Sequence, residues 1–237
     1  MKILGLDRGA SSTKAVILNN RQLIFKQIIS PNDSLPACEQ KFCSQNLNEF
    51  ECNSRGALFL TKLNSAVVVS CGTGTSVVWA RKNKPVEHLG GTGIGGGTLL
   101  GLGKLILKTD SFKKILALAA TGNQTKVNLT VGDVLGKGIG RLPPEATAAN
   151  FGQIKSTKKT DFAAALVSLV AETIAMVACL AAKPTQETNL VFIGRLATNA
   201  LIQQNLSAVC VMYNLNPLFP KDAAFATALG AALFHQS

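Results

Sequence analysis

The chain contains one pattern of strands and turns twice, and this repetition restricts the folds that it can adopt. In the first copy, apolar residues predict a strand at 2–6, followed by a turn of small residues at 7–14 (DRGASSTK). Two further strands are expected at 15–18 and 22–29, separated by an asparagine turn at 19–20. We interpret this pattern as one structural unit.

The second copy has the same order of elements. Strands are predicted at 66–70, 77–80 and 86–89, with turns at 71–76 (CGTGTS) and 81–84 (RKNK). Two such copies predict two related lobes that face each other. Each turn of Gly, Ser and Thr would present backbone N–H groups beside small side chains, which is the chemistry of a phosphate-binding loop.

The second copy leads into a glycine-rich stretch, residues 88–104 (HLGGTGIGGGTLLGLGK), which contains eight glycines. In regular structure each glycine costs about 0.5–1 kcal/mol relative to alanine, so this number of glycines needs a physical reason. Apolar spacing predicts helices at 98–107 and 111–122, and unpaired N–H groups at a helix N-terminus attract anions. The stretch therefore favours a phosphate site. A glycine hinge that packs two elements together is the alternative.

The charge of the chain raises the question of nucleic-acid binding. Its formal net charge is +11, and cationic surfaces bind phosphate backbones by releasing counterions. The basic residues are scattered, however, and their clusters at 81–84 and 155–159 have no interleaved aromatic side chains for base stacking. We therefore expect no nucleic-acid partner, and a basic surface around a site for an anionic small molecule.

The cysteines and the N-terminal residues indicate a cytoplasmic protein. None of the six cysteines belongs to a C-x-x-C pair, and with only two histidines the pattern predicts no zinc site. The apolar run before Asp7 and Arg8 is too short for a secretory signal. We therefore expect reduced cysteines and a cytoplasmic location.

An apolar segment at 162–183 has the length of a membrane span. It is rich in alanine and has Glu172 near its centre, where the carboxylate would strongly destabilise a membrane span. Asp161 is the expected N-cap and Pro184 the expected stop signal. We predict a buried helix of a soluble protein without membrane contact, which could also pack against a second subunit.

Several motifs in a fixed order resemble those of the type II pantothenate kinases, within the superfamily of acetate and sugar kinases, heat-shock chaperone ATPases and actin. The resemblance covers about residues 1–18 and 46–237. The motifs, which include two phosphate loops, a segment with a catalytic glutamate, a glycine signature and an adenosine loop, are DRGASSTK (7–14), NEFECNSRG (48–56), GTGTS (72–76), GGTGIGGGTLLGLGKLI (90–106), ATAANFG (146–152), VFIGRLATNALI (191–202) and AFATALGAALF (224–234).

The resemblance implies an α/β fold with two ribonuclease-H-like lobes of the actin/sugar-kinase superfamily and an ATP site in the cleft between them. Residues 1–65 would form a shortened N-terminal lobe with the first phosphate loop. Residues 66–237 would form a C-terminal lobe with the second phosphate loop, the glycine-rich loop and the adenosine loop. The resemblance also implies a homodimer that uses ATP and Mg²⁺ to phosphorylate pantothenate to 4′-phosphopantothenate, the first step of coenzyme A biosynthesis.

The family motifs assign roles to individual residues of this chain. Glu49 corresponds to the general base, which takes the proton of the attacking hydroxyl. Asp7 would hold Mg²⁺ directly or through water, and Lys14 would lie near the phosphates. A turn-capping Asp7, a surface Lys14 and a core Phe112 are the alternatives at those positions. The other residues expected to border ATP are Arg8, Gly9, Ala10, Ser11, Ser12, Thr13, Thr73, Gly96, Gly97, Thr98, Leu99, Leu100, Phe112 and Arg195.

The chain departs from the family pattern at four places. Ala10 occupies a glycine position of the first loop, where a positive φ would add about 1–2 kcal/mol of strain. His88 replaces an arginine directed at the substrate or the transferring phosphoryl group, and a neutral imidazole would supply less charge there. Arg195 replaces a small residue of the adenosine loop, and segment 30–48 is shorter than its family counterpart. We expect these changes to affect activity and substrate identity more than the fold.

Two other functions stay open. Residues 13–18 (TKAVIL) are also similar to activator ATPases of the dehydratase type, which hold an iron–sulfur cluster between subunits through cysteines near a glycine motif. An absorption spectrum of anaerobically purified protein would detect such a cluster. His88 and the short first lobe are also compatible with a non-catalytic nucleotide-binding protein. Such a protein would consume no ATP, with or without pantothenate.

Overall fold

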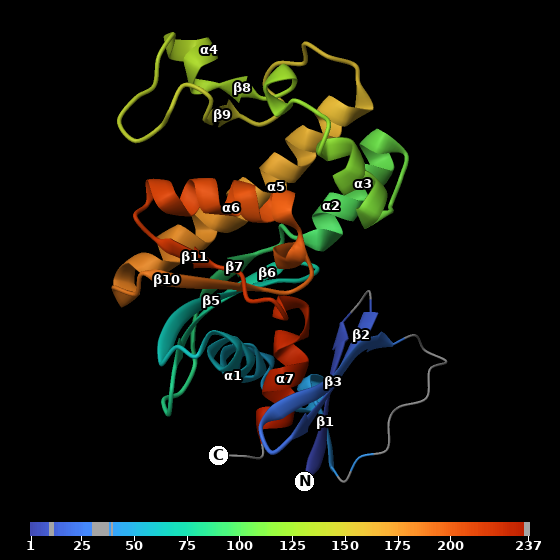
Figure 1. Cartoon of the computed structure of the whole chain (residues 1–237). Coiled ribbons are helices and arrows are strands. Elements are labelled where there is room, and N and C mark those ends of the chain that lie inside the picture. The colour runs from blue at the N-terminus through green and yellow to red at the C-terminus, as the bar shows by residue number, and fades with distance from the viewer. Residues whose placement is uncertain (10–11, 30–37, 39, 235–237) are drawn as a thin grey trace.

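The first copy of the repeat forms a four-stranded sheet (Figure 1). The computed structural model describes residues 1–9, 12–29, 38 and 40–234. Strands β1, β2 and β3 pair antiparallel in chain order, and β4 pairs parallel with β1. The strand order is β3-β2-β1-β4, with the bounds Gln22–Ile29, Ser12–Asn19, Lys2–Gly9 and Gln40–Cys43.

The three strands of the second copy lie in a five-stranded sheet whose antiparallel part has the same arrangement. Strands β5, β6 and β7 pair antiparallel in chain order, β10 pairs parallel with β5, and β11 continues the sheet beyond β10. The prediction of an α/β fold with two related units is confirmed. The strand order is β11-β10-β5-β6-β7, with the bounds Asn216–Leu218, Asn189–Ile193, Ser65–Cys71, Thr75–Arg81 and Glu87–Thr92.

Both small-residue turns are narrower than the sequence predicts. Asp7 of β1 lies opposite Lys14 of β2 in paired strands and not in a loop. In the second sheet, β5 and β6 pair as far as Cys71 and Thr75. Pairing continues toward each hairpin tip because every antiparallel partner satisfies the backbone N–H and C=O groups of the opposite strand.

Helices cover both faces of the second sheet (Figure 1). Helix α1 (Glu49–Thr61) lies on one face, and α5 (Lys159–Ala182) and α6 (Ala200–Met212) lie on the other. Successive strand residues enter opposite cores, since Val68 packs under α1 and Val69 packs under α5. Burial on both faces explains why these strands are continuous apolar runs in the sequence.

The glycine-rich stretch passes from β7 into helix, as predicted. Helix α2 (Gly96–Leu102) continues into a π-helical turn at Gly103–Leu107, and α3 (Phe112–Ala119) follows. These elements match the helices predicted at 98–107 and 111–122, with boundaries moved by at most three residues.

The apolar helix predicted at 162–183 is α5, and its apolar surface packs inside the chain. Length and composition would allow this helix to cross a membrane, but 61% of the relevant window is buried in the fold. Glu172 lies beside two hydroxyl groups, and its Oε1 accepts hydrogen bonds from Thr147 (3.0 Å) and Ser168 (2.6 Å). The glutamate is therefore satisfied by partners within the chain.

The start of α5 differs from the prediction. Lys158 occupies the N-cap position, and Asp161 lies in the first turn of the helix. The Asp161 carboxylate accepts hydrogen bonds from the hydroxyl of Ser156 (2.6 Å) and from the amide of Asn123 (2.8 Å), which lower its pKa. Asp161 thus ties the preceding loop to the helix, a long-range contact that the capping pattern did not reveal.

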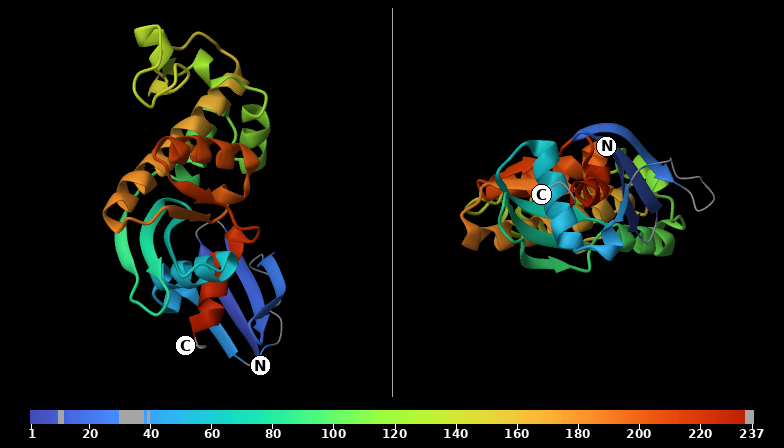
Figure 2. Two further views of the ribbon diagram at one scale, coloured as in Figure 1. Left: turned by 60° about the vertical axis from the view of Figure 1, so that its left-hand side comes forward. Right: turned by 90° about the horizontal axis from the view of Figure 1, so that it is seen from below.

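A small outer unit extends beyond this end of α5, on the side of the molecule opposite the first sheet (Figure 2). It contains β8 (Leu129–Thr130), α4 (Val131–Leu135) and β9 (Thr147–Ala149). Only two short strands pair in this unit, so it adds little to the main core.

The C-terminal helix α7 (Ala226–Leu233) connects the two units. It packs on β1 and β2 of the first sheet and on α1, which in turn covers the second sheet. The two helices approach so closely that a Cβ atom at Gly56 would clash with the carbonyl oxygen of Ala226. A Cβ atom at Gly230 would likewise clash with the carbonyl oxygen of Cys52. Glycine is required at both positions because the backbones are in direct contact.

The division of the chain into lobes of residues 1–65 and 66–237 stays a prediction. Two helices pack on the sheet of the other part of the chain. Helix α1 comes from the first part but covers the second sheet, whereas α7 comes from the second part and covers the first sheet. At Gly5 of β1, the carbonyl of Ala228 leaves no space for a side chain. The two parts are therefore interleaved in space.

We predict that Gly56→Ala and Gly230→Ala each lower the free energy of unfolding by about 1–3 kcal/mol or more, because the added methyl group forces the two helices apart. Gly101→Ala is the matched control, since no atom lies within 4 Å of its Cβ position. In the helix interior this control should raise stability by about 0.5–1 kcal/mol. Urea unfolding measures all three, and equal effects would contradict the proposed contact.

Candidate functional site

A cavity of about 670 Å³ lies where the two sheets, α1, α2, α3 and α7 meet. Its walls come from segments distant in sequence, including β1, the β5–β6 turn and the loop after β10. Eleven of the residues predicted for the site line it: Asp7, Arg8, Gly9, Lys14, Glu49, Thr73, Gly96, Gly97, Leu100, Phe112 and Arg195. The structure thus brings most of the predicted residues together.

The other predicted residues lie elsewhere. Leu99 is fully buried in the core under α5, because it occupies the inner face of α2. Thr98 instead caps α2, where its hydroxyl accepts a hydrogen bond from the amide of Gly95 (3.3 Å). Ser12, Thr13 and His88 are not among the residues that line the cavity, and Ala10 and Ser11 lie outside the described residues.

Sequence reasoning also missed residues that line the cavity. Some of the missed residues are sequence neighbours of predicted ones. Those in the GTGTS motif at 72–76 could have been identified from that motif. Ser44 has no motif signal, because its position depends on the parallel pairing of β4 with β1. The missed residues are Ser44, Phe50, Ser70, Cys71, Gly72, Gly74, Thr75, Ser76, Thr92, Gly194, Leu196, Ala224 and Thr227.

One charged pair lies at the first-sheet side of the cavity. The Lys14 Nζ atom is 2.9 Å from Asp7 Oδ2, and the Ser44 hydroxyl donates a hydrogen bond to Asp7 Oδ1 (3.2 Å). The side chains of Asp7 and Lys14 are only 15% and 14% exposed. Asp7 is therefore bonded to side chains within the cavity wall and does not cap a turn, and Lys14 is not a surface residue.

Glu49 is the first residue of α1, and its helix start is well defined. The Asn48 side chain caps the helix by accepting hydrogen bonds from the amides of Phe50 (3.0 Å) and Glu51 (3.4 Å). A carboxylate in the first turn also interacts favourably with the helix dipole. The Oε2 atom of Glu51 lies 3.8 Å from the Nη2 atom of Arg55 in a partly exposed ion pair. Glu49, in contrast, lines the cavity.

The glycine-rich stretch packs against the β5–β6 turn, which is the packing role given above as the alternative, and its phosphate role stays a prediction. The amides of Gly96 and Gly97 donate to the carbonyls of Gly72 and Thr73, each at 2.9 Å. These helix-start N–H groups are therefore used within the protein. A Cβ atom at Gly95 would lie 2.5 Å from the Thr73 oxygen, so the glycines allow two backbones to touch.

The β5–β6 turn keeps amides that a phosphate could use. In the part of the chain that the structure describes, the amides of Thr73 and Gly74 donate no backbone hydrogen bond. The turn lines the cavity and is fixed from behind by α2. The phosphate chemistry predicted for this turn stays a prediction, for which these two amides are available.

Cys71 borders the cavity but is not a nucleophile at neutral pH. The residue is fully buried, and burial raises the pKa of its thiol to about 12. Burial likewise raises the pKa of Cys52 to about 12. Among the described residues, no group of three or more His, Cys, Asp or Glu side chains could hold a metal ion. The polar groups that line the cavity are carboxylate, ammonium, guanidinium, hydroxyl and backbone groups.

Comparison with known proteins gives one family match. Residues 59–234 match the family model described as Fumble. The chain is 28% identical over 267 aligned residues to the type II pantothenate kinase of Bacillus anthracis, covering 98% of this chain and 96% of that protein. It is 36% identical over 174 residues to the type II pantothenate kinase of Oceanobacillus iheyensis, covering 70% of this chain and 63% of that protein.

Solved structures share the fold at low sequence identity. A ROK family glucokinase from Streptomyces griseus, in complex with glucose and AMPPNP, superposes with a TM-score of 0.61 at 12% identity, covering all of both chains. A ROK hexokinase from Thermus thermophilus gives a TM-score of 0.58 at 14% identity and covers 98% of both chains. These neighbours confirm the sugar-kinase type of fold expected from the motifs.

We predict that Gly95→Ala lowers stability by about 1–3 kcal/mol, because its methyl group displaces the β5–β6 turn from α2. The same change should weaken binding of ATP, since the turn lines the cavity. Gly93→Ala in the same stretch is the control, because its Cβ position meets no atom within 4 Å. Thermal unfolding with and without Mg·ATP compares the two. Equal losses from both variants would contradict a packing role that is specific to Gly95.

Proposed function

The chain belongs to the Fumble family of type II pantothenate kinases, and on this basis we propose that it transfers a phosphoryl group from ATP to the primary hydroxyl of pantothenate. The observation that carries the proposal is the composition of the cavity. A partly buried Asp7–Lys14 pair, a phosphate-type hairpin turn and Glu49 line one cavity from three separate elements. Phosphoryl transfer depends mainly on such positioning and on neutralisation of charge.

We assign Asp7 to Mg²⁺ and Lys14 to the phosphates. A partly buried carboxylate is the kind of oxygen ligand that Mg²⁺ prefers, and Ser44 holds one of its oxygens in place. When bound, the metal ion would neutralise charge on the phosphates. Lys14 can contribute to the same neutralisation because it lines the cavity and its ammonium group lies beside Asp7.

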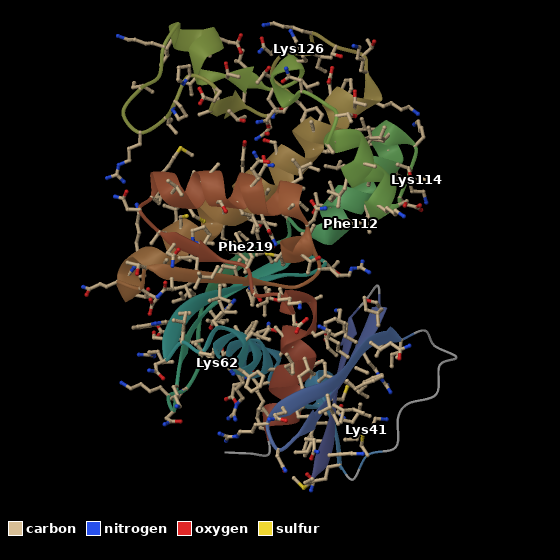
Figure 3. All side chains as sticks on the ribbon, viewed as in Figure 1. Lys41, Lys62, Phe112, Lys114, Lys126 and Phe219 are labelled. Carbon is tan, nitrogen blue, oxygen red and sulfur yellow. The ribbon has the colours of Figure 1, made fainter. Side chains whose placement is uncertain are left out.

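We assign the adenosine end of the cavity to the loop after β10 and the start of α3. Arg195 and Leu196 follow Gly194, whose φ of 93° turns the chain and whose amide donates to the carbonyl of Ala223 (2.9 Å). Phe112, which is labelled in Figure 3, belongs to the first turn of α3. It lines the same cavity. Apolar and guanidinium groups of this kind suit an adenine base and a nearby phosphate.

A cytoplasmic location is also proposed. Cys52, Cys71, Cys179 and Cys210 are buried thiols without disulfide bonds, which supports a reducing compartment. Action without nucleic acid or a membrane remains a prediction from the sequence.

The decisive experiment measures ATP consumption by the purified protein with and without pantothenate, and identifies the product by its mass. The proposal requires consumption that depends on pantothenate and a product heavier by one phosphoryl group. ATP consumption without an acceptor would instead favour an ATPase of the same superfamily, and no consumption would favour a nucleotide-binding protein.

We predict that Glu49→Gln lowers turnover roughly 10²–10⁴-fold, because the amide keeps the shape of the side chain but cannot accept the proton of the hydroxyl. The affinity for ATP should change little, since the base contacts the acceptor and not the nucleotide. Glu51→Gln is the control, because its carboxylate pairs with Arg55 on the surface. Full pantothenate-dependent turnover by Glu49→Gln would contradict the assignment.

We also propose a homodimer, and the structure changes the argument for it. The apolar faces of α5 are largely buried within the chain, so they no longer require a second subunit. Better candidates for the dimer interface are Leu180 and Val211, whose side chains are 48% and 65% exposed. They follow Cys179 and Cys210 in sequence, and the sulfur atoms of these two cysteines are in contact in the core.

Light scattering at micromolar concentration should give the mass of a dimer, and Val211→Asp should shift it toward the monomer. Ile24→Asp is the control, because Ile24 is a similarly exposed apolar residue on β3. A monomer at all concentrations would contradict the dimer, and equal effects of both variants would contradict the assigned surface.

A further inference from the structure

We propose that Phe50 recognises the branched alkyl part of the acceptor alcohol and that His88 is a positioning residue that fixes the Phe50 ring. The inference rests on the proposed function, which makes pantothenate the acceptor. It gives His88 a role different from the direct contact with the phosphoryl group that the family motif predicts.

The two rings form a stacked pair. Their centroids are 4.6 Å apart and their planes differ by 9°. Phe50 lines the cavity, whereas His88 is not among the described residues that line it. His88 therefore acts on the cavity through the ring of Phe50. Parallel aromatic pairs of this kind contribute beyond the area that they bury.

Helix α1 fixes the position of Phe50. The Phe50 amide donates to the capping oxygen of Asn48 at 3.0 Å, which holds the first turn of the helix. Glu49 precedes Phe50 directly, and both line the same cavity. The proposed base and the aromatic ring therefore occupy adjacent positions on one rigid element.

An irregularity in β7 fixes the position of His88. In its pairing with β6, the strand skips Leu89, and Gly90 beyond it has a φ of 143°. Such a β-bulge changes the direction of neighbouring side chains and is common beside functional sites. Glycine permits this conformation, which other residues rarely adopt. The bulge thus places the His88 imidazole against α1.

The chemistry of pantothenate supplies a partner for the Phe50 ring. Its reacting hydroxymethyl group is attached to a carbon atom that carries two methyl groups. An alcohol whose hydroxyl lies at Glu49 would bring these methyl groups beside the next residue, Phe50. Loss of a methyl or methylene contact in such a pocket typically changes kcat/KM by about 10–200-fold.

The test compares pantothenate with an analogue in which hydrogens replace the two methyl groups. We expect Phe50→Ala to raise the KM for pantothenate about 10-fold or more and to lower the preference for pantothenate over the analogue by a similar factor. Phe50→Leu, which keeps an apolar side chain, should show smaller changes in the KM for pantothenate and in this preference. The KM for ATP should not change, because the ring lies at the acceptor.

His88 is tested by variants that separate stacking from charge. His88→Ala should raise the KM for pantothenate about 3–10-fold, whereas His88→Phe should restore it because an aromatic ring stacks without being basic. The double variant Phe50→Ala/His88→Ala should be no worse than Phe50→Ala alone. A rise in the KM for pantothenate in His88→Phe as large as in His88→Ala would overturn the positioning role and favour direct charge.

The remaining controls separate this inference from general loss of structure and from the proposed function. Phe219→Ala removes another stacked ring, which packs on Phe192 with centroids 5.2 Å apart and does not line the cavity (Figure 3). It should lower the melting temperature without changing the preference between the two acceptors. A native protein that does not phosphorylate pantothenate would refute the proposed function. A native protein that does so, with unchanged preference in folded Phe50→Ala or Phe50→Leu, would refute only the inference.

Discussion

The direct backbone contact between α1 and α7 holds the two halves of this protein together. At Gly56 and Gly230 the helices touch without intervening side chains, and Gly5 allows α7 an equally close approach to β1. Because α1 also covers the second sheet, one glycine-mediated crossing fixes the two sheets relative to each other. The cavity is lined from both sheets and from α7, so its shape depends on this crossing.

Much of the fold could be predicted because its signals are local. The repeated strand pattern gave all six strands of the two antiparallel meanders, since alternating and continuous apolar runs depend only on nearby residues. The widths of the hairpin turns could not be obtained in this way. Gly, Ser and Thr indicate a turn by their composition, but cross-strand pairing extends β1 and β2 through most of the segment 7–14.

The site was predicted only in part, because motifs are local signals and some of the site's contacts join distant segments. Motifs identified residues on loops and helix starts, such as Glu49 and Thr73, which line the cavity. They misplaced Leu99, whose side chain belongs to the core, and overlooked Ser44 and Phe50. Ser44 reaches Asp7 only through parallel pairing of distant strands, and the Phe50–His88 stack joins a helix to a strand 38 positions later (88 − 50). No short pattern contains such contacts.

The position of α7 has a consequence for synthesis of the chain. The strands of the first sheet are synthesised well before residues 226–233, which supply the helix that covers Ile3, Val16 and Leu18. Domains that fold as they emerge normally complete their N-terminal part first. Here the strands of the first sheet keep an apolar face uncovered until residues 226–233 have been made. We therefore expect the nascent chain to expose this apolar face during most of its synthesis.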